Sequence, residues 1–158
     1  MRVLVADDEA PARARLIALL KSAPGDVQVV GEAGSGSDVL AQCEQQAVDL
    51  VLLDIRMPGM DGIDAALALA AHPSPPAVIF VTAYHEHALA AFDANAIDYL
   101  LKPVRPQRLL RALDKARVLS QEQQAVLAET GSYLSVSYRG GVQRIPAADV
   151  ILLRADSK

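Results

Sequence analysis

The stretch LVLLDIRMPGMDG, residues 50–62, decides the fold class of this chain. Its first four residues are continuously apolar, which is the pattern of a central parallel strand that is covered on both faces. Asp54 follows this strand directly. Parallel strands are joined by crossover segments that are usually helices, so strand-like and helical patterns should alternate on both sides of the stretch.

Short β-type runs and helical patterns do alternate along the first 120 residues or so. The expected strands are residues 3–6, 27–30, 50–53, 78–81 and 98–101. The expected helices cover residues 12–23, 39–46, 63–71 and 86–94, and a long segment from Pro106 onward. Ser37 is the expected N-cap of the second helix. Five alternating units of this kind predict an α/β fold with a five-stranded, doubly wound parallel sheet.

Composition limits the class of protein further. The 158 residues suffice for one domain and a further segment, and 52% hydrophobic residues can form a core. No apolar run reaches the ~18 residues that cross a bilayer, and no secretory signal begins the chain, so we expect a cytoplasmic protein without membrane partners. The net charge of −4 does not by itself indicate nucleic-acid binding. Cys43 has no second cysteine to pair with, and we expect a half-buried filler rather than a redox sensor.

Five polar residues share one position relative to the strands. Each follows an apolar strand directly, and they are Asp7, Asp8, Asp54, Thr82 and Lys102. In doubly wound sheets the ligand crevice lies at the carboxyl ends of the strands. Taken singly, an aspartate here is equally well a helix N-cap, and the lysine a solvated loop residue. Their coincidence at one edge favours a functional site.

The chemistry of this set suits phosphoryl transfer to a carboxylate. Two carboxylates ~4 Å apart repel each other by roughly 4 kcal/mol at an effective dielectric constant near 20. Mg²⁺ removes this repulsion, prefers oxygen ligands and recruits phosphate oxygens. Lys102 adds a positive charge, and Thr82 adds a hydroxyl donor for a phosphoryl oxygen. Nucleophile, metal, lysine and donor are the parts that such a reaction needs.

Four motifs resemble, in order and spacing, those of response-regulator receiver domains. They are VLVADDEAPAR (3–13), LVLLDIRMPGMDG (50–62), VIFVTAY (78–84) and DYLLKP (98–103). The resemblance covers residues 1 to about 120 and implies the flavodoxin or CheY-like strand order 2-1-3-4-5. It also implies that Asp54 is the phosphoacceptor. Mg²⁺ would be bound by Asp8, Asp54 and the main-chain carbonyl of Arg56, with Asp7 acting through water.

The same resemblance assigns roles on the fourth and fifth strands. Thr82 and Lys102 would contact the phosphoryl group, and the Lys102–Pro103 peptide bond would be cis, which proline permits. Tyr99 would be the aromatic residue that changes rotamer when Thr82 moves; the alternative is a half-buried strand residue. Two further residues, Arg56 and Tyr84, lie two positions after Asp54 and Thr82. Their bulk would shield the acyl phosphate from water, so we expect slow self-dephosphorylation.

The C-terminal part of the chain has a different pattern. We expect a receiver domain at residues 1–118, a polar linker at 119–131, and the incomplete start of a second domain at 132–158. The segment YLSVSYRGGVQRIPAADVILLRADSK (133–158) resembles the opening strands of a LytTR-type DNA-binding domain. A hairpin is expected around Gly140–Gly141, followed by a strand at 150–154. The whole resembles an AlgR/LytR-like transcriptional regulator that is cut short.

The resemblance implies a two-component response regulator rather than an enzyme, with only its own autophosphorylation and dephosphorylation chemistry. Its partners would be a sensor histidine kinase, DNA through a complete C-terminal domain, and a second copy upon phosphorylation. Two alternatives remain open. One is a stand-alone receiver that acts by protein contact alone. The other is a Mg²⁺-dependent aspartyl phosphohydrolase, which usually needs a second acid where this chain has Arg56.

Three weaker patterns complete the analysis. Gly34–Gly36 suggests a phosphate loop, but Val39 occupies the third glycine position, so an ordinary loop is expected. His85 and His87 have metal-ligand chemistry without an evident third ligand, so a solvated helix start is expected. A basic helix face is expected to be solvated, with a partner or DNA contact as the alternative; it consists of Arg108, Arg111 and Lys115.

Overall fold

The computed structural model describes the backbone of residues 1–84, 96–130, 133–138 and 141–146, and the side chains of these residues up to 121. The chain divides into two compact units, residues 1–118 and 119–158. Helix α5 (Pro106–Thr130) begins in the first unit and ends in the second.

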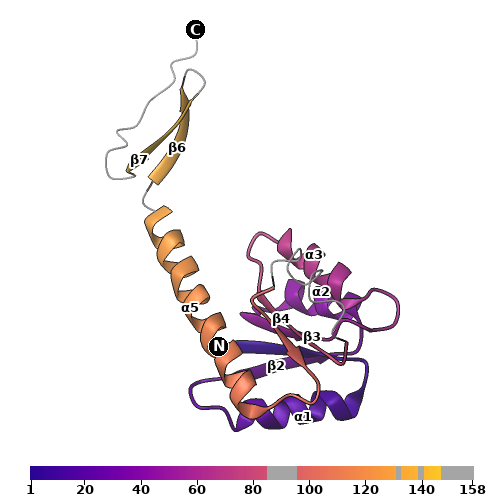
Figure 1. The fold of residues 1–158 in the computed structure, drawn as a ribbon. Helices are drawn as coiled ribbons and strands as arrows, with labels where there is room; N and C mark the ends of the chain where they lie inside the picture. The colour runs from indigo at the N-terminus through magenta and orange to yellow at the C-terminus, as the bar shows by residue number, and fades with distance from the viewer. Residues whose placement is uncertain (85–95, 131–132, 139–140, 147–158) are drawn as a thin grey trace. The chain divides into compact units, whose positions relative to one another are not determined.

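The first unit contains a five-stranded sheet whose neighbouring strands all run parallel (Figure 1). The strand order is β2-β1-β3-β4-β5, which confirms the predicted doubly wound fold. The strands are β1 (Arg2–Ala6), β2 (Gln28–Ala33), β3 (Leu50–Leu53), β4 (Ala77–Thr82) and β5 (Asp98–Leu101). The helices of this unit are α1 (Ala10–Lys21), α2 (Gly36–Gln45), α3 (Gly62–Ala70) and the first part of α5. The helix expected at 86–94 lies outside the described residues.

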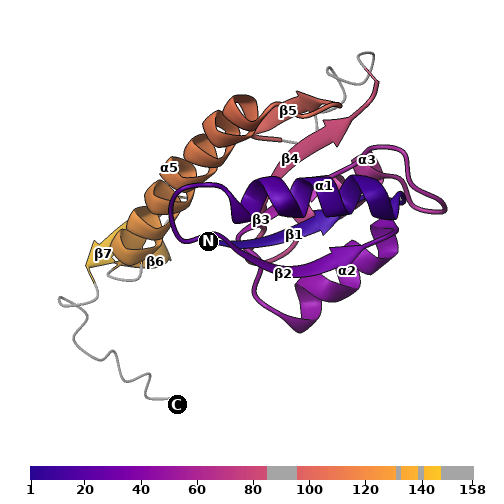
Figure 2. The same cartoon turned by 90° about the horizontal axis from the view of Figure 1, so that it is seen from below.

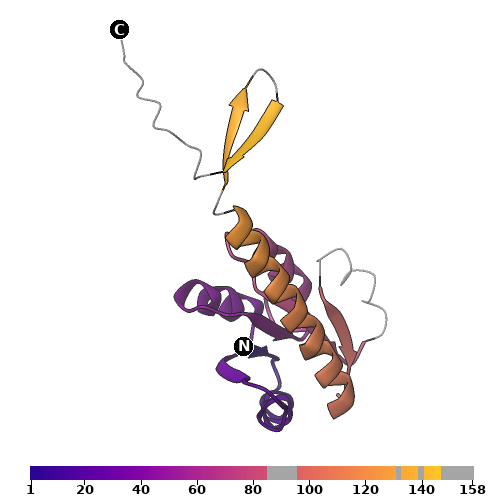
Figure 3. The ribbon, with the colours of Figure 1, turned by 90° about the vertical axis from the view of Figure 1, so that its left-hand side faces the viewer.

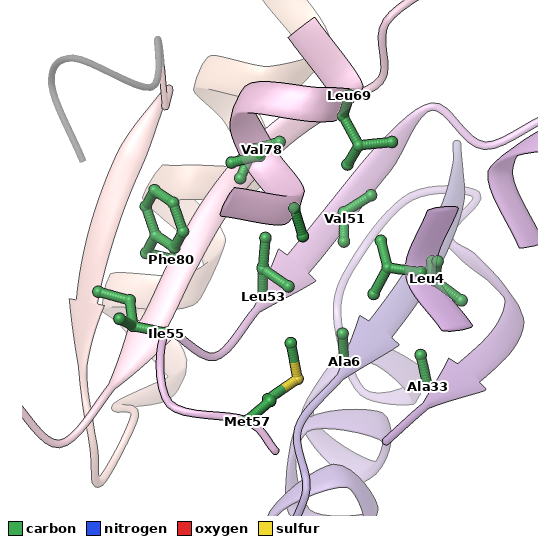
Figure 4. Packing of buried hydrophobic residues seen from close by; sticks show 13 residues of the cluster. Leu4, Ala6, Ala33, Val51, Leu53, Ile55, Met57, Leu69, Val78 and Phe80 are labelled. Carbon is green, nitrogen blue, oxygen red and sulfur yellow. The ribbon is translucent and has the colours of Figure 1, made fainter. Parts of the chain in front are cut away.

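Alternation of side chains along the strands divides the core into two layers. Leu4 and Leu53 face a cluster that includes buried residues of α2 and α3, among them Leu69 (Figure 4). Val3 and Leu52 face the opposite way, toward buried residues of α1 and α5. Figures 1 and 2 show α1 on one side of the sheet and α2 and α3 on the other. All residues of β3 are buried, as a central strand covered on both faces requires.

The N-cap of helix α2 lies two residues before the predicted cap position. Ser35, not Ser37, is the N-cap, and its side chain accepts a hydrogen bond from the Asp38 amide at 3.2 Å. The reason is a tertiary contact: the amide of Gly36 donates to the carbonyl oxygen of Met60, at 3.2 Å. A Cβ atom at position 36 would lie 2.6 Å from that oxygen. The start of α2 is therefore set by its contact with the loop before α3.

Helix α3 also begins at a glycine that touches another backbone segment. The amide of Gly62 donates to the carbonyl oxygen of Ile55 at 2.7 Å. Asp61 is the N-cap, and its side chain accepts from the Asp64 amide at 2.9 Å. A Cβ atom at position 62 would lie 2.0 Å from the carbonyl oxygen of Asp54, which is closer than any real contact allows. Only glycine lets α3 approach the loop after β3 this closely.

The second unit contains an antiparallel hairpin of β6 (Tyr133–Tyr138) and β7 (Gly141–Pro146) (Figure 3). Its register pairs Tyr138 with Gly141, which leaves a two-residue connection and confirms the predicted hairpin. The expected strand at 150–154 lies outside the described residues. Helix α5 extends through most of the expected linker, because glutamine and glutamate are good helix formers despite their polarity. In the described part of the chain, no helix combines the length and hydrophobicity needed to cross a membrane.

The contact at Gly62 gives a stability prediction. Gly62→Ala should lower the free energy of unfolding by about 1–3 kcal/mol, because a backbone carbonyl cannot move aside without displacing the loop after β3. Urea denaturation measures the change. Gly34→Ala is the matched control, since no atom lies within 4 Å of a Cβ built there, and it should change stability by no more than about 0.5 kcal/mol. Equal stability of the two variants would contradict the close approach.

Candidate functional site

The carboxyl ends of four strands bring the predicted polar residues to one edge of the sheet. In the register of the sheet, Ala6 lies opposite Leu53, and Thr82 lies opposite Leu101. Asp7, Asp8 and Asp54 therefore leave neighbouring strands at the same level. Backbone hydrogen bonds continue just beyond the strands, from the Asp54 amide to Ala6 at 2.8 Å and from the Lys102 amide to Thr82 at 2.9 Å. The Lys102–Pro103 peptide bond is cis.

Lys102 lies between two buried carboxylates. Its ammonium nitrogen Nζ donates a hydrogen bond to Asp54 Oδ2 at 2.7 Å and forms an ion pair with Asp7 Oδ2 at 2.6 Å. Asp7 is 0% exposed and Asp54 is 6% exposed. Burial lowers the pKa of the Lys102 ammonium, but the two carboxylates raise it by more, so the net pKa lies above the ordinary lysine value. The group therefore stays charged at neutral pH.

The carboxylates have the arrangement that a divalent cation needs. One oxygen from each of Asp7, Asp8 and Asp54 lies within 4.8 Å of the others. Among the described residues, Asp54 Oδ1 and Thr82 Oγ1 are buried without a hydrogen-bond partner. A buried polar atom without a partner is costly unless a ligand completes its contacts. Three clustered carboxylates with one unsatisfied oxygen fit a hard cation such as Mg²⁺.

Arg56, Tyr84 and Tyr99 form a second group of contacts. The guanidinium carbon of Arg56 lies 4.3 Å from the ring centroid of Tyr84, which is a cation–π contact. The hydroxyl of Tyr99 donates a hydrogen bond to the main-chain carbonyl of Tyr84. Tyr99 is half-buried and packs against the core layer of α2 and α3. The two residues expected to shield the phosphoacceptor thus contact each other, and one of them, Tyr84, also contacts the expected switch residue Tyr99.

Two of the three basic residues on α5 pair with β5 while their side chains stay largely exposed, Arg108 at 43% and Lys115 at 56%. Arg108 donates two hydrogen bonds to the Asp98 carboxylate, at 2.6 and 2.8 Å, and Lys115 donates one at 3.0 Å. Burial raises the pKa of Asp98, but the hydrogen bonds from Arg108, Lys115 and the Tyr99 amide hold it well below its ordinary value. Arg111 is exposed, as expected. The basic face is therefore in part an ion-pair network that fastens α5 to β5.

Two residues near the site were missed by the sequence analysis. Arg13 donates from Nη1 to the main-chain carbonyl of Asp7 at 2.7 Å, and from Nε to Glu32 Oε2 at 3.0 Å. The sequence signal that could have pointed to Arg13 is its positive charge in the first turn of α1, where the helix dipole disfavours a cation. Gly62, the second residue, ends a motif that was read for its acids, although its lack of a side chain shapes the Asp54 loop.

The weaker patterns do not add to the site. Ser35, between Gly34 and Gly36, caps α2, so the stretch is the loop before a helix. Burial raises the pKa of the Cys43 thiol to about 11, which keeps it protonated and unreactive at neutral pH. This agrees with a filler role. His85 and His87 lie outside the described residues.

Comparison with known proteins agrees with this geometry. Residues 3–114 match the sequence profile of the response regulator receiver domain. The chain is 41% identical over 166 aligned positions to the Positive alginate biosynthesis regulatory protein of Pseudomonas aeruginosa, covering 100% of this chain and 67% of that protein. It is 39% identical to the Sensory transduction protein LytT of Bacillus cereus, covering 78% of this chain and 50% of that protein. The chain thus spans two thirds or less of the length of these relatives.

Solved structures show the same relationship. The response regulatory domain of mrkE from Klebsiella pneumoniae superposes with a TM-score of 0.71 at 33% identity, covering 77% of this chain and 99% of that one. The signal receiver domain of the putative response regulator NarL from Mycobacterium tuberculosis superposes with a TM-score of 0.67 at 34% identity, covering 73% of this chain and 95% of that one. With its acidic sheet edge, its strand order and a profile match over most of its length, the chain belongs to the response regulator receiver domain family.

Proposed function

We propose that this chain accepts a phosphoryl group on Asp54 in a Mg²⁺-dependent reaction and passes the signal to an output domain. One observation carries the proposal: Asp54 is almost fully buried, with one oxygen paired to Lys102 and the other without a partner among the described residues. A carboxylate held in this way has a fixed orientation and keeps one oxygen for a ligand. Such positioning is the main protein contribution to phosphoryl transfer.

The reaction can be followed through the residues of the chain. A carboxylate oxygen of Asp54 attacks the phosphorus atom of the donor, and the bond from phosphorus to the donor's leaving atom breaks. The electron pair stays with the leaving group, which takes up a proton. The Lys102 ammonium stabilises the charge on the transferred oxygens. The Thr82 hydroxyl is buried and has no hydrogen-bond partner among the described residues, so it is available to donate to one of them.

The metal ligands follow from the partners that each carboxylate already has. Asp7 Oδ1 accepts from the Glu9 amide at 3.0 Å, and Asp7 Oδ2 faces Lys102. Asp8 is exposed, and Asp54 Oδ1 has no hydrogen-bond partner in the described part of the chain. We therefore propose Asp8 and Asp54 as direct ligands, with Asp7 acting through water. The main-chain carbonyl of Arg56 is proposed as a further direct ligand from the resemblance to receiver domains. When bound, Mg²⁺ neutralises the clustered acids and the incoming phosphoryl oxygens.

The switch would start from the added charge. Phosphorylation adds about one negative charge and new acceptor oxygens at Asp54. The Thr82 hydroxyl then has a partner, and its movement changes the space beside Tyr99 in the neighbouring strand. Shifting the ratio of active to inactive conformations from 1:99 to 99:1 needs interactions that favour the active conformation by about 5.5 kcal/mol. A few charge-assisted hydrogen bonds from Thr82 and Lys102 supply energies of this order.

The partners are inferred from the relatives. A sensor histidine kinase is the proposed phosphoryl donor. Residues 1–118 are the proposed receiver, 119–131 the linker, and 132–158 the start of a LytTR-type domain that in complete form would bind DNA. One relative, 36% identical, is named Transcriptional regulatory protein YpdB, of Escherichia coli. A homodimer upon phosphorylation and a cytoplasmic location complete the proposal.

Two alternatives make different predictions. A stand-alone receiver would act by protein contact alone, and it is distinguished by whether the native reading frame continues past Lys158. An aspartyl phosphohydrolase would turn over a phosphomonoester repeatedly. It is disfavoured because Arg56, at the position of the usual second acid, stacks on Tyr84.

The phosphoacceptor is tested by chemical phosphorylation. Acetyl phosphate with Mg²⁺ should add one phosphoryl group to the wild type and none to Asp54→Asn, because the amide is not a nucleophile. Intact-protein mass spectrometry measures the added group. Asp64→Asn is the matched control, since Asp64 is an exposed aspartate in the first turn of α3, and it should be labelled like the wild type. Equal labelling of Asp54→Asn would remove this residue from its role.

The shielding pair is tested by the lifetime of the phosphorylated protein. Arg56→Asn should shorten the half-life by about 2–5-fold, because losing a cation–π contact of about 0.5–1 kcal/mol opens the site to water more often. The decay is followed by mass spectrometry after acetyl phosphate is removed. Arg111→Asn, an exposed arginine on α5, should leave the half-life unchanged. An unaltered lifetime in Arg56→Asn would exclude shielding by this residue.

A further inference from the structure

Arg13 occupies a place in the helix that local forces do not favour. It lies in the first turn of α1, which contains no acidic residue. A helix N-terminus carries a partial positive charge, so a cation there costs energy. Arg13 is nevertheless ordered by contacts, with only 20% of its side chain exposed. A tertiary interaction must therefore account for its position.

The guanidinium of Arg13 joins two segments beside the acidic edge. Nη1 donates to the main-chain carbonyl of Asp7 at 2.7 Å, and Nε pairs with Glu32 Oε2 at 3.0 Å. Glu32 lies near the end of β2, and its own carbonyl accepts from Gln42 Nε2 at 2.6 Å. Arg13 thus ties the loop after β1 to a strand end that α2 also holds in place.

The carbonyl that Arg13 binds belongs to the peptide joining Asp7 to Asp8. Because a peptide unit is planar, fixing its oxygen also fixes the direction of the amide that follows. The direction in which the Asp8 side chain leaves the backbone depends on that orientation. Asp8 is exposed, and its side chain makes no hydrogen bond with any of the described residues. Backbone support is therefore the means by which the fold can aim Asp8.

We propose that Arg13 is a positioning residue for the divalent cation: it orients the Asp7–Asp8 peptide so that Asp8 and Asp54 bind one ion together. This inference rests on the proposed Mg²⁺ site. For the removal of Arg13, the proposal and simple electrostatics predict opposite changes in the affinity for the cation. Removing a positive charge beside three carboxylates should strengthen cation binding, whereas losing a residue that orients a ligand weakens it, typically by 10- to 100-fold.

The test is Mg²⁺ binding by the unphosphorylated full chain, measured from backbone amide chemical shifts during a MgCl₂ titration. Arg13→Ala should bind Mg²⁺ about tenfold more weakly than the wild type. Arg13→Lys keeps the charge but cannot make both bonds, so it should also bind more weakly. Arg15→Ala removes the same charge from an exposed position on the same helix and should bind as tightly as the wild type or slightly more tightly.

Thermal unfolding without Mg²⁺ shows whether each variant folds. If Arg13→Ala does not fold, the Mg²⁺ affinity of Arg13→Lys tests the proposal instead. Weaker binding by the folded Arg13 variants, with Arg15→Ala unaffected, supports the positioning role. Unchanged or tighter binding by both Arg13 variants overturns it and leaves the proposed function intact. A wild type that binds no Mg²⁺ overturns the proposed metal site itself, and with it this inference.

Discussion

A single ammonium group between two buried carboxylates holds the functional edge of this protein together. Lys102 reaches from the end of β5 to Asp7 after β1 and Asp54 after β3, and so joins three strand ends. Without it, the two acids would repel each other by an amount comparable to a large part of a domain's stability. With it, the pocket still has more acids than bases, because Asp8 also lies there. This remaining negative charge favours a metal cation, which in the proposed function would in turn admit an anionic phosphoryl group.

The backbone around this edge is fixed by close contacts rather than by the acids themselves. Gly62 allows α3 to pack against the Asp54 carbonyl. Gly36 allows α2 to contact the carbonyl of Met60, in the loop between β3 and α3. Arg13 holds the Asp7 carbonyl from the other side. Asp54 and its neighbours are therefore held on several sides, whereas Asp8 and Arg56 are exposed. Rigid support around a few accessible groups is what a site for a small, transient anion requires.

In the proposed switch, β5 connects the site to the rest of the chain. It carries Tyr99, which contacts the carbonyl of Tyr84, and it ends at Leu101, directly before Lys102 of the site. The Asp98 carboxylate at its start is bound by Arg108 and Lys115 of α5, and hydrogen bonding keeps it ionised. A shift of β5 would therefore act on α5, the helix that continues into the second unit. In this proposal the ion pairs of Asp98 with Arg108 and Lys115 would couple β5 directly to α5.

The amino-acid sequence alone determined the order of strands and helices, the central burial of β3 and the polar residues at the strand ends, because periodicity and strand-end position are local properties of the chain. It also grouped Asp54, Thr82 and Lys102 as candidate site residues through their position at the ends of strands. The cap at Ser35, the role of Gly62 and the contacts of Arg13 and Arg108 were decided only by the tertiary structure. Each depends on a distance between segments far apart in the chain, and such distances arise only when the layers pack.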